Sequence, residues 1–191
     1  AGIDYKVSGS FLEIYNEQLK DLLCDANKQE DLKIRLDPRS ATGKDLFVQG
    51  LTELSLITEN DYSKVIATGV QRRVVAETNM NAVSSRSHSV LTITIMQTEK
   101  IPGKPDGIMK RSKIHLIDLA GSERAESTGA TGALLKEGAA INQSLSCLGN
   151  VINALSTGST HVPYRDSKLT YLLSDSLGGN SITLLIACLT P

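Results

Sequence analysis

A candidate phosphate-binding element lies in the middle of the chain. The apolar run that begins at Ile114 ends in Asp118, and Gly121 follows three residues later. In phosphate-binding α/β proteins, an Asp at the end of a strand can hold Mg²⁺, usually through water. A glycine beyond it lets a backbone N–H approach a terminal phosphate, because no Cβ is in the way. Taken alone, this short pattern favours the simpler interpretation, which is an Asp that caps a strand and a Gly in a turn.

A second polar group precedes the β-branched run at residues 89–96. The segment NAVSSRSH occupies residues 81–88 and offers the hydroxyls of Ser84 and Ser85, which suit Mg²⁺ or phosphate oxygens. Arg86 adds a rigid fork of hydrogen-bond donors. The alternative is an ordinary helix-to-strand loop whose Arg pairs at the surface. Because both polar loops flank strands predicted to be adjacent and antiparallel, we expect both to reach one site.

The elements around these loops alternate between strand-like and helix-like segments, which is typical of an α/β fold. We expect strands at residues 7–15, 32–36, 46–51, 89–96, 113–119 and 182–189, and helices at 16–23, 58–70, 138–155 and 166–177. The segment 101–107 contains two prolines and two glycines and is predicted to close a hairpin. Residues 182–189 form a nearly continuous apolar run, as expected for a strand covered on both faces. The prediction is one domain over residues 1–191, with a central mixed sheet flanked by helices on both faces.

Composition narrows the classes of function. The chain has 191 residues, of which 40% are hydrophobic and 21% charged, as in ordinary globular proteins. Its net charge of −1 gives no global positive field for nucleic acid. The longest apolar run, residues 182–189, is too short to cross a bilayer, so we expect neither a nucleic-acid partner nor membrane insertion. Three widely spaced cysteines without a CxxC pair indicate reduced thiols in the cytosol and no structural zinc.

Together, the two polar loops resemble those of the kinesin motor family. The motif NxxSSRSH at residues 81–88 is similar to the family's switch I, and DLAGSE at 118–123 to its switch II. The similarity continues in the family's order through SFLEIYNEQLKDLL at 10–23, LKEGAAINQSLSCLGNVINAL at 135–155, HVPYRDSKLT at 161–170 and DSLGGNS at 175–181. The resemblance covers nearly the whole chain and implies a kinesin-like P-loop NTPase fold that lacks its N-terminal part.

The resemblance also implies roles for individual residues around ATP and Mg²⁺. Ser84 would position the attacking water and Ser85 would coordinate Mg²⁺. Asp118 would hold the water shell of the metal, and Gly121 would contact the terminal phosphate through its amide. These roles agree with the chemistry that the residue types suggest on their own.

An ion pair between the two switches is implied as well. Arg86 and Glu123 would form it, stabilise the closed state and relay a proton from the attacking water. An Arg–carboxylate pair can form two parallel hydrogen bonds and is strong when shielded from water. The alternative is a bridge that only holds two loops together.

The phosphate-cradling loop of the family is missing from this sequence. A P-loop requires G-x-x-x-x-G-K-[ST] after a strand. The two Gly-Lys pairs, at Gly43 and Gly103, have neither the upstream Gly nor a following Ser or Thr. We therefore expect the chain to begin after the family's P-loop and to end before its neck linker. ATP and Mg²⁺ would bind only together with the missing segment, so the isolated chain is predicted to be inactive.

Two functions of different classes follow. The first is part of an ATP-dependent, microtubule-based motor, which the joint presence of both switch motifs favours. The second is a non-catalytic kinesin-like module that binds microtubules or a partner motor chain, which the missing P-loop favours. A small G protein is a poor third option. The sequence NKQE at residues 27–30 resembles its guanine-reading motif, but it ends in Glu and precedes both switches.

A microtubule-binding face is implied by the two C-terminal helices, within residues 138–177. Cations there would steer and hold the acidic surface of tubulin, although any single one is more often a solvated side chain. The candidate residues are Arg124, Lys136, Asn142, Arg165, Lys168 and Tyr171. Many kinesins carry Lys at the position of Gln143 and Arg at that of Tyr171, which predicts weaker binding. The resemblance further implies a location in the cytoplasm on the cytoskeleton, and a possible dimer through a stalk that these residues do not include.

Overall fold

The computed structural model describes the chain except for residues 1, 26–27, 29–30, 39, 41–42, 80–85, 102–103, 122–132, 179–180 and 189–191. The chain falls into two compact units. Unit 1 comprises Ala1–Lys33 and Gly50–Glu123, and unit 2 comprises Ile34–Gln49 and Arg124–Pro191. The assignment of all residues to one domain stays a prediction.

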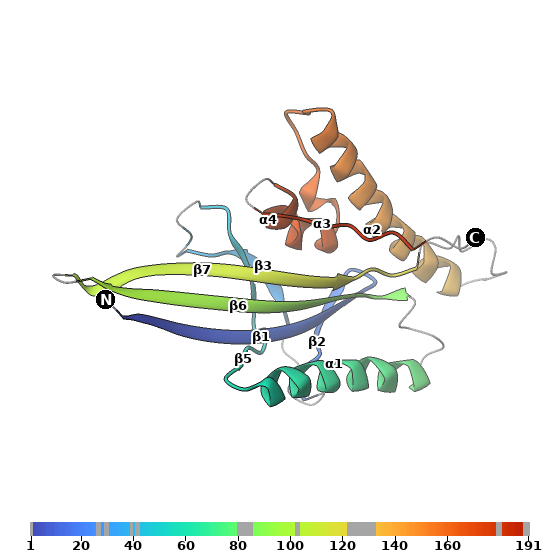
Figure 1. Cartoon of the computed structure of the whole chain (residues 1–191). Coiled ribbons are helices and arrows are strands. Elements are labelled where there is room, and N and C mark those ends of the chain that lie inside the picture. Colours follow the sequence, from blue (N-terminus) through green and yellow to red (C-terminus); the bar gives the residue numbers. More distant parts are fainter. Residues whose placement is uncertain are drawn as a thin grey trace. The chain divides into compact units, whose positions relative to one another are not determined.

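Unit 1 is built on an antiparallel sheet (Figure 1). Its strands are β1 (Ile3–Tyr15), β2 (Gln18–Asp21), β5 (Leu54–Ser55), β6 (His88–Ile101) and β7 (Lys104–Asp118). The order is β2-β1-β6-β7, and β5 also pairs with β1. The predicted hairpin of the fourth and fifth strands is confirmed, although both strands are longer than expected. In its register Ser89 lies opposite Asp118, so the strand ends that border the two candidate loops lie at the same end of the sheet.

The helix expected at residues 16–23 is wrong. Asn16 and Glu17 both have positive φ, at 49° and 56°, and form a two-residue turn that leads straight into β2. Tyr15 pairs with Gln18 across this turn, which is the geometry of a tight hairpin. The helical spacing of the leucines was misleading. The long β1 offers backbone hydrogen bonds to the returning strand, and the hairpin buries Leu22 in the core.

Helix α1 (Glu59–Asn79) covers part of one face of this sheet (Figure 1). It begins where the sequence predicted but continues well beyond residue 70. The Asp61 amide donates to Thr58 Oγ1 at 3.4 Å, and the Thr58 amide donates to Asp61 Oδ2 at 2.8 Å. This reciprocal capping satisfies backbone donors that the first turn leaves free. The Thr58 amide and hydroxyl both donate to the Asp61 carboxyl, and these hydrogen bonds lower its pKa.

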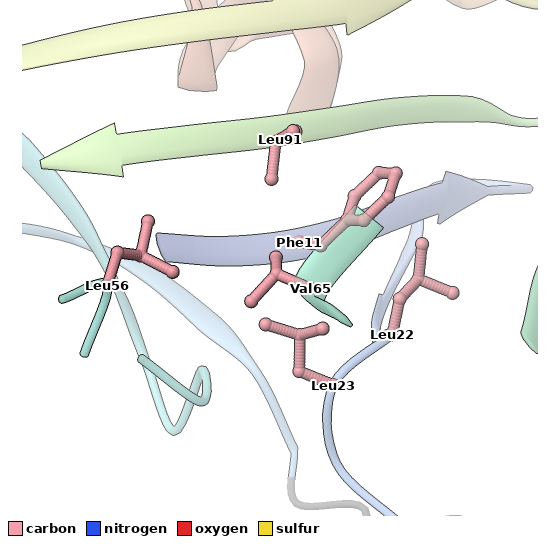
Figure 2. Close-up of a cluster of buried hydrophobic side chains, with 6 residues drawn as sticks. All are labelled: Phe11, Leu22, Leu23, Leu56, Val65 and Leu91. Carbon is pink, nitrogen blue, oxygen red and sulfur yellow. The ribbon is translucent and has the colours of Figure 1, made fainter. Parts of the chain in front are cut away.

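The hydrophobic core of unit 1 lies between α1 and the sheet. Figure 2 shows its buried side chains, which are Phe11, Leu22, Leu23, Leu56, Val65 and Leu91. The helix approaches β1 closely at Gly69, where a Cβ atom would lie only 2.0 Å from Phe11 Cδ1. A glycine is therefore required at this point of contact.

Unit 2 combines a small sheet with helices. Its elements are β3 (Lys33–Leu36), β4 (Leu46–Gln49), α2 (Ala133–Ser156), η4 (Tyr164–Asp166), α3 (Lys168–Leu172) and α4 (Ser174–Leu177). The two short strands and the long helix agree with the predictions, and the structure adds that β3 pairs with β4. The single helix expected at 166–177 is instead three short ones. Ser167 is extended, and its side chain accepts a hydrogen bond from the Thr170 amide, so it starts a new helix rather than continuing one.

The strand expected at residues 182–189 is also wrong for the described part, 182–188. These residues form no strand. Their large apolar side chains are exposed, and Ile182 and Leu184 expose 105% and 82% of their surface. An apolar run becomes a strand only when a neighbouring strand pairs with its backbone groups. No strand in the described part of the chain does so here. Among the described helices, none is both long and apolar enough to span a membrane.

Candidate functional site

The two strand ends of unit 1 bring part of the predicted site together. Asp118 is the last residue of β7, and it lies opposite Ser89 near the start of β6. Arg86 precedes β6, and Gly121 follows β7 by three residues. Ser84, Ser85 and Glu123 lie outside the described residues. The predicted pair of Arg86 with Glu123 therefore stays a prediction.

Asp118 presents its carboxylate to solvent, with a side-chain exposure of 71%. One of its oxygens, Oδ2, accepts a hydrogen bond from Arg73 Nη1 at 3.0 Å. The other oxygen faces no hydrogen-bond donor among the described residues. An accessible carboxylate at the end of a strand is therefore available for a ligand.

Arg73 reaches this strand end from α1. Its side chain is only 13% exposed, and Nη1 also donates to Ser89 Oγ at 2.9 Å. On its other side, Nε lies 3.8 Å from Oε1 of Glu13, a carboxylate that is only 3% exposed. Ser87 donates a 2.6 Å hydrogen bond to the same oxygen, and Lys20 Nζ lies 4.0 Å from Oε2. A buried charge needs such partners, because it has lost its water.

His88 forms a second link between the two strand ends. It is buried, and its Nδ1 accepts a hydrogen bond from the Ala120 amide at 3.0 Å. Burial lowers the pKa of His88 to about 4, and the nearby charge of Asp118 only partly opposes this shift. The ring is therefore neutral near pH 7 and carries its proton on Nε2. This contact holds the backbone immediately before Gly121 against the start of β6.

The donor set at this end suits Mg²⁺ rather than a transition metal. The described residues contain no cluster of three or more His, Cys, Asp or Glu that could hold a metal ion. Mg²⁺ keeps several of its waters and binds through one or two carboxylates together with substrate phosphates. The accessible carboxylate of Asp118 fits that requirement.

The candidate microtubule-binding residues belong to unit 2, and the structure brings two of them together. The guanidinium carbon of Arg165, in η4, lies 5.7 Å from the centre of the Tyr171 ring in α3, a cation–π contact. Lys168 opens α3 and is half-buried, as is Asn142 on α2. Arg124 and the side chain of Lys136 lie outside the described part.

A family model for the kinesin motor domain matches residues 2–191. The chain belongs to the kinesin motor domain family. Among curated relatives, it is 51% identical to Kinesin-related protein 1 of Dictyostelium discoideum over 98% of this chain and 9% of that protein. It is 48% identical to Chromosome-associated kinesin KIF4B of Homo sapiens over 98% of this chain and 15% of that protein. The chain thus spans only a small part of these relatives.

Solved kinesin structures show the same fold. A structure titled as a fast kinesin matches with a TM-score of 0.77 and 44% identity over 92% of this chain and 47% of its own length. The motor and motor homology domain of Kar3Vik1 matches with a TM-score of 0.75 and 38% identity over 94% and 45% of the two chains. The expected α/β, kinesin-like fold is confirmed.

Sequence reasoning missed the buried residues that support the candidate site from the interior of unit 1. Ser87 and His88 belong to the switch I motif, but the motif does not indicate that they contact Glu13 and the Ala120 amide. Glu13 lies in a strand between Leu12 and Ile14, and alternation places it on a face without showing that the face is buried. Arg73 lies beyond residue 70, where the predicted helix ends. Nothing in the sequence therefore indicated that its side chain reaches Asp118.

Proposed function

We propose that this chain forms the switch-containing part of an ATP-hydrolysing, microtubule-based motor. The observation that carries the proposal is the accessible Asp118 carboxylate at the end of β7, opposite Ser89 and close to the switch I motif. In this function Asp118 holds the water shell of Mg²⁺, and Ser85 coordinates the metal. Gly121 contacts the terminal phosphate through its amide, and Ser84 positions the attacking water.

Closure of the two switches is proposed to depend on Arg86 and Glu123. Their ion pair would form when the terminal phosphate draws both loops together, and it would relay the proton of the attacking water. Nucleotide affinity would depend mainly on the phosphate cradle. These 191 residues contain no P-loop motif, so a segment that carries one must complete the site.

ATP turnover with and without microtubules tests this proposal. The 191-residue chain alone is expected to show none. The chain fused behind a kinesin segment that carries the G-x-x-x-x-G-K-[ST] motif is expected to show microtubule-stimulated hydrolysis. In that fusion, Arg86→Ala or Glu123→Ala should lower turnover by about 10²–10³-fold with little change in nucleotide affinity. Turnover by the chain alone, or full turnover in both variants, would contradict the assigned roles.

The microtubule face is proposed to be α2, η4 and α3 of unit 2. The stacked pair of Arg165 and Tyr171 supports this, because the ring fixes a cation that would otherwise be mobile. Co-sedimentation of the chain with microtubules across a salt series tests it. Arg165→Ala should weaken binding and reduce its salt dependence. Arg35→Ala is the matched control, since Arg35 is a cation of the same unit that contacts Gln49 on β4.

The second candidate function is a non-catalytic module that binds microtubules or a partner motor chain. The stacked pair of Arg165 and Tyr171 supports it, because a contact of this kind needs no phosphate cradle. The same two assays separate the functions. Salt-dependent microtubule binding by the chain, together with no turnover by the fusion, would support the module and exclude the catalytic role. ATP and Mg²⁺ belong to the first function, whereas microtubule binding in either function would place the chain on the cytoskeleton.

A further inference from the structure

We propose that His88 is a positioning residue that fixes the backbone of Ala120 and thereby holds the amide of Gly121 in the orientation that the terminal phosphate needs. This inference rests on the proposed function, because that function assigns the phosphate contact to Gly121. It gives a side chain of the switch I motif a role in switch II. Three observations carry it: one hydrogen bond, the burial around it and the anchoring of the strand that presents the ring.

The backbone of Ala120 lies just beyond the hairpin formed by β6 and β7. The described pairing of these strands ends with Ser89 opposite Asp118. Ala120 follows Asp118 by two residues, so the described ladder between β6 and β7 does not include it. A side chain provides the contact at this point, because the Ala120 amide donates to His88 Nδ1 at 3.0 Å. This hydrogen bond extends the link between the two strands toward Gly121.

Both partners of this hydrogen bond are buried. His88 exposes 2% of its surface and Ala120 exposes 5%. A backbone N–H in such a place has lost its water, so removal of its acceptor is costly. Nδ1 accepts only in a neutral ring that carries its proton on Nε2. Burial favours that form, because it lowers the pKa of His88 to about 4.

The ring of His88 is presented from an anchored part of the sheet. His88 is the first residue of β6 and lies opposite Ile14 of β1. The preceding residue, Ser87, is fully buried and donates a 2.6 Å hydrogen bond to Glu13 Oε1. Glu13 belongs to β1, and its side chain is only 3% exposed. A ring attached here can restrain the chain that it contacts.

Restraint of the Ala120 amide carries over to the amide of Gly121. Each peptide group is planar, and the planes that contain these two N–H groups share the Cα atom of Ala120. Only the φ and ψ torsions of Ala120 separate the two planes, and the burial of this residue limits both. An amide that is oriented before the reaction stabilises developing charge on a phosphate without a cost of reorganisation.

Four substitutions separate the hydrogen bond from simple packing. His88→Phe keeps a flat ring and removes the acceptor. His88→Asn places an amide oxygen where Nδ1 lies, whereas His88→Gln places it near Nε2, one bond further from the backbone. His115→Phe is the matched control, because His115 Nδ1 also contacts a β6 residue, Thr92 Oγ1, at 2.9 Å. That contact joins the same two strands away from their ends at Ser89 and Asp118.

The test is NMR of the ¹³C,¹⁵N-labelled 191-residue chain at neutral pH. In the unchanged chain, His88 Nδ1 should have the ¹⁵N shift of an unprotonated nitrogen and a scalar coupling to the Ala120 amide across the hydrogen bond. In His88→Phe and His88→Gln, the Ala120 amide should exchange with water at least about 10-fold faster, and the backbone order of Gly121 should fall. His88→Asn should restore much of both, and His115→Phe should change neither.

The spectra of the unchanged chain keep the proposal falsifiable even if His88→Phe does not fold. A protonated Nδ1 without the coupling to Ala120 would overturn it. The proposal would also be overturned if Gly121 were as ordered in His88→Gln as in the unchanged chain. None of these readings requires nucleotide, so they do not depend on the motor function.

Turnover by the chain fused behind a P-loop segment tests the consequence for the reaction. His88→Phe should lower kcat by about 10–10²-fold, because a displaced donor weakens contacts in the transition state. The affinity for ADP, which lacks the terminal phosphate, should change little. His88→Asn should recover part of kcat, whereas His88→Gln should not. Full kcat in His88→Phe would overturn the inference.

Failure of this inference is distinguishable from failure of the proposed function. If the unchanged fusion shows no turnover, the proposed function fails, and the NMR readings still decide whether His88 holds Ala120 and Gly121. If the unchanged fusion turns over ATP and the His88 variants behave like His115→Phe in both assays, only the inference fails.

Discussion

The core of unit 1 and the segment 182–188 are both rich in apolar residues, but the first is buried and the second is exposed. In the core, Leu22 is 0% exposed and packs among side chains from β1, β6 and α1. In the segment, Leu184 is 82% exposed and no described strand pairs with its neighbours. Apolar character alone is therefore not sufficient for burial. A segment is buried only where other elements supply both hydrogen bonds and a surface to pack against.

The largest expected effect is on the free energy of unfolding, which should respond to truncation of a leucine in the core but not in the segment 182–188. Leu22→Ala should lower the free energy of unfolding of the chain by about 2–5 kcal/mol, because it removes buried methyl groups and leaves a cavity. Leu184→Ala should change it by less than about 0.5 kcal/mol, because the side chain is already in water. Urea unfolding of both variants and the unchanged chain measures this. An equal loss in the two variants would show that residues 182–188 are covered in solution.

The difference also explains how much the sequence could reveal. The hairpin of β6 and β7 and the start of α1 were predictable, because β-branched runs and the pair of Thr58 with Asp61 act within a short stretch of chain. The turn at Asn16 and the lack of a strand at 182–188 could not be predicted. Both depend on whether another strand is available to pair with the segment's backbone. Helical spacing of leucines cannot show that β1 is free to pair with them.

The candidate site divides in the same way. Asp118 and Gly121 were found because a strand end followed by a glycine is a local pattern. Glu13 and Arg73 were missed because they are 60 residues apart in sequence. They meet only because α1 packs across β1. Their burial is a property of the tertiary structure, and a charged residue within a strand or helix is ordinarily solvated.

The second effect is the pH dependence of stability that arises from the buried His88. The pKa of His88 is about 4 in the folded chain, below its ordinary value of 6.5, because burial disfavours the charged ring. The unfolded chain therefore takes up a proton first as the pH falls. The stability that His88 contributes is complete above pH 6.5 and is lost between pH 6.5 and 4, by at most about 1.4 kcal/mol per pH unit.

Urea unfolding at several pH values checks this, with His88→Asn as the comparison. Asn cannot titrate, so the difference in pH dependence between the two proteins isolates the histidine. The variant should be less stable near pH 7, because it packs differently, but its stability should fall less steeply below pH 6.5. Parallel curves for the two proteins would mean that His88 is solvated and that its contact with the Ala120 amide does not persist.

The smallest expected effect compares two glycines in helices, one covered and one open. At Gly69 on α1, a Cβ would lie 2.0 Å from Phe11 Cδ1, so Gly69→Ala forces the helix and sheet apart. Overpacking of this kind costs about 1–3 kcal/mol. At Gly149 on α2, a Cβ would meet nothing within 4 Å. Gly149→Ala should therefore stabilise the chain by about 0.5–1 kcal/mol, because alanine loses less backbone entropy in a helix.

The opposite signs make this pair a strict test of the packing in unit 1. Both substitutions improve intrinsic helix propensity by the same amount, so only the surroundings distinguish them. Thermal and urea unfolding should show a lower midpoint for Gly69→Ala and a higher one for Gly149→Ala. If both variants gained stability, α1 would not approach β1 as closely as the contact with Phe11 requires. The position of Arg73 next to Asp118, which depends on the same packing, would then have to be revised.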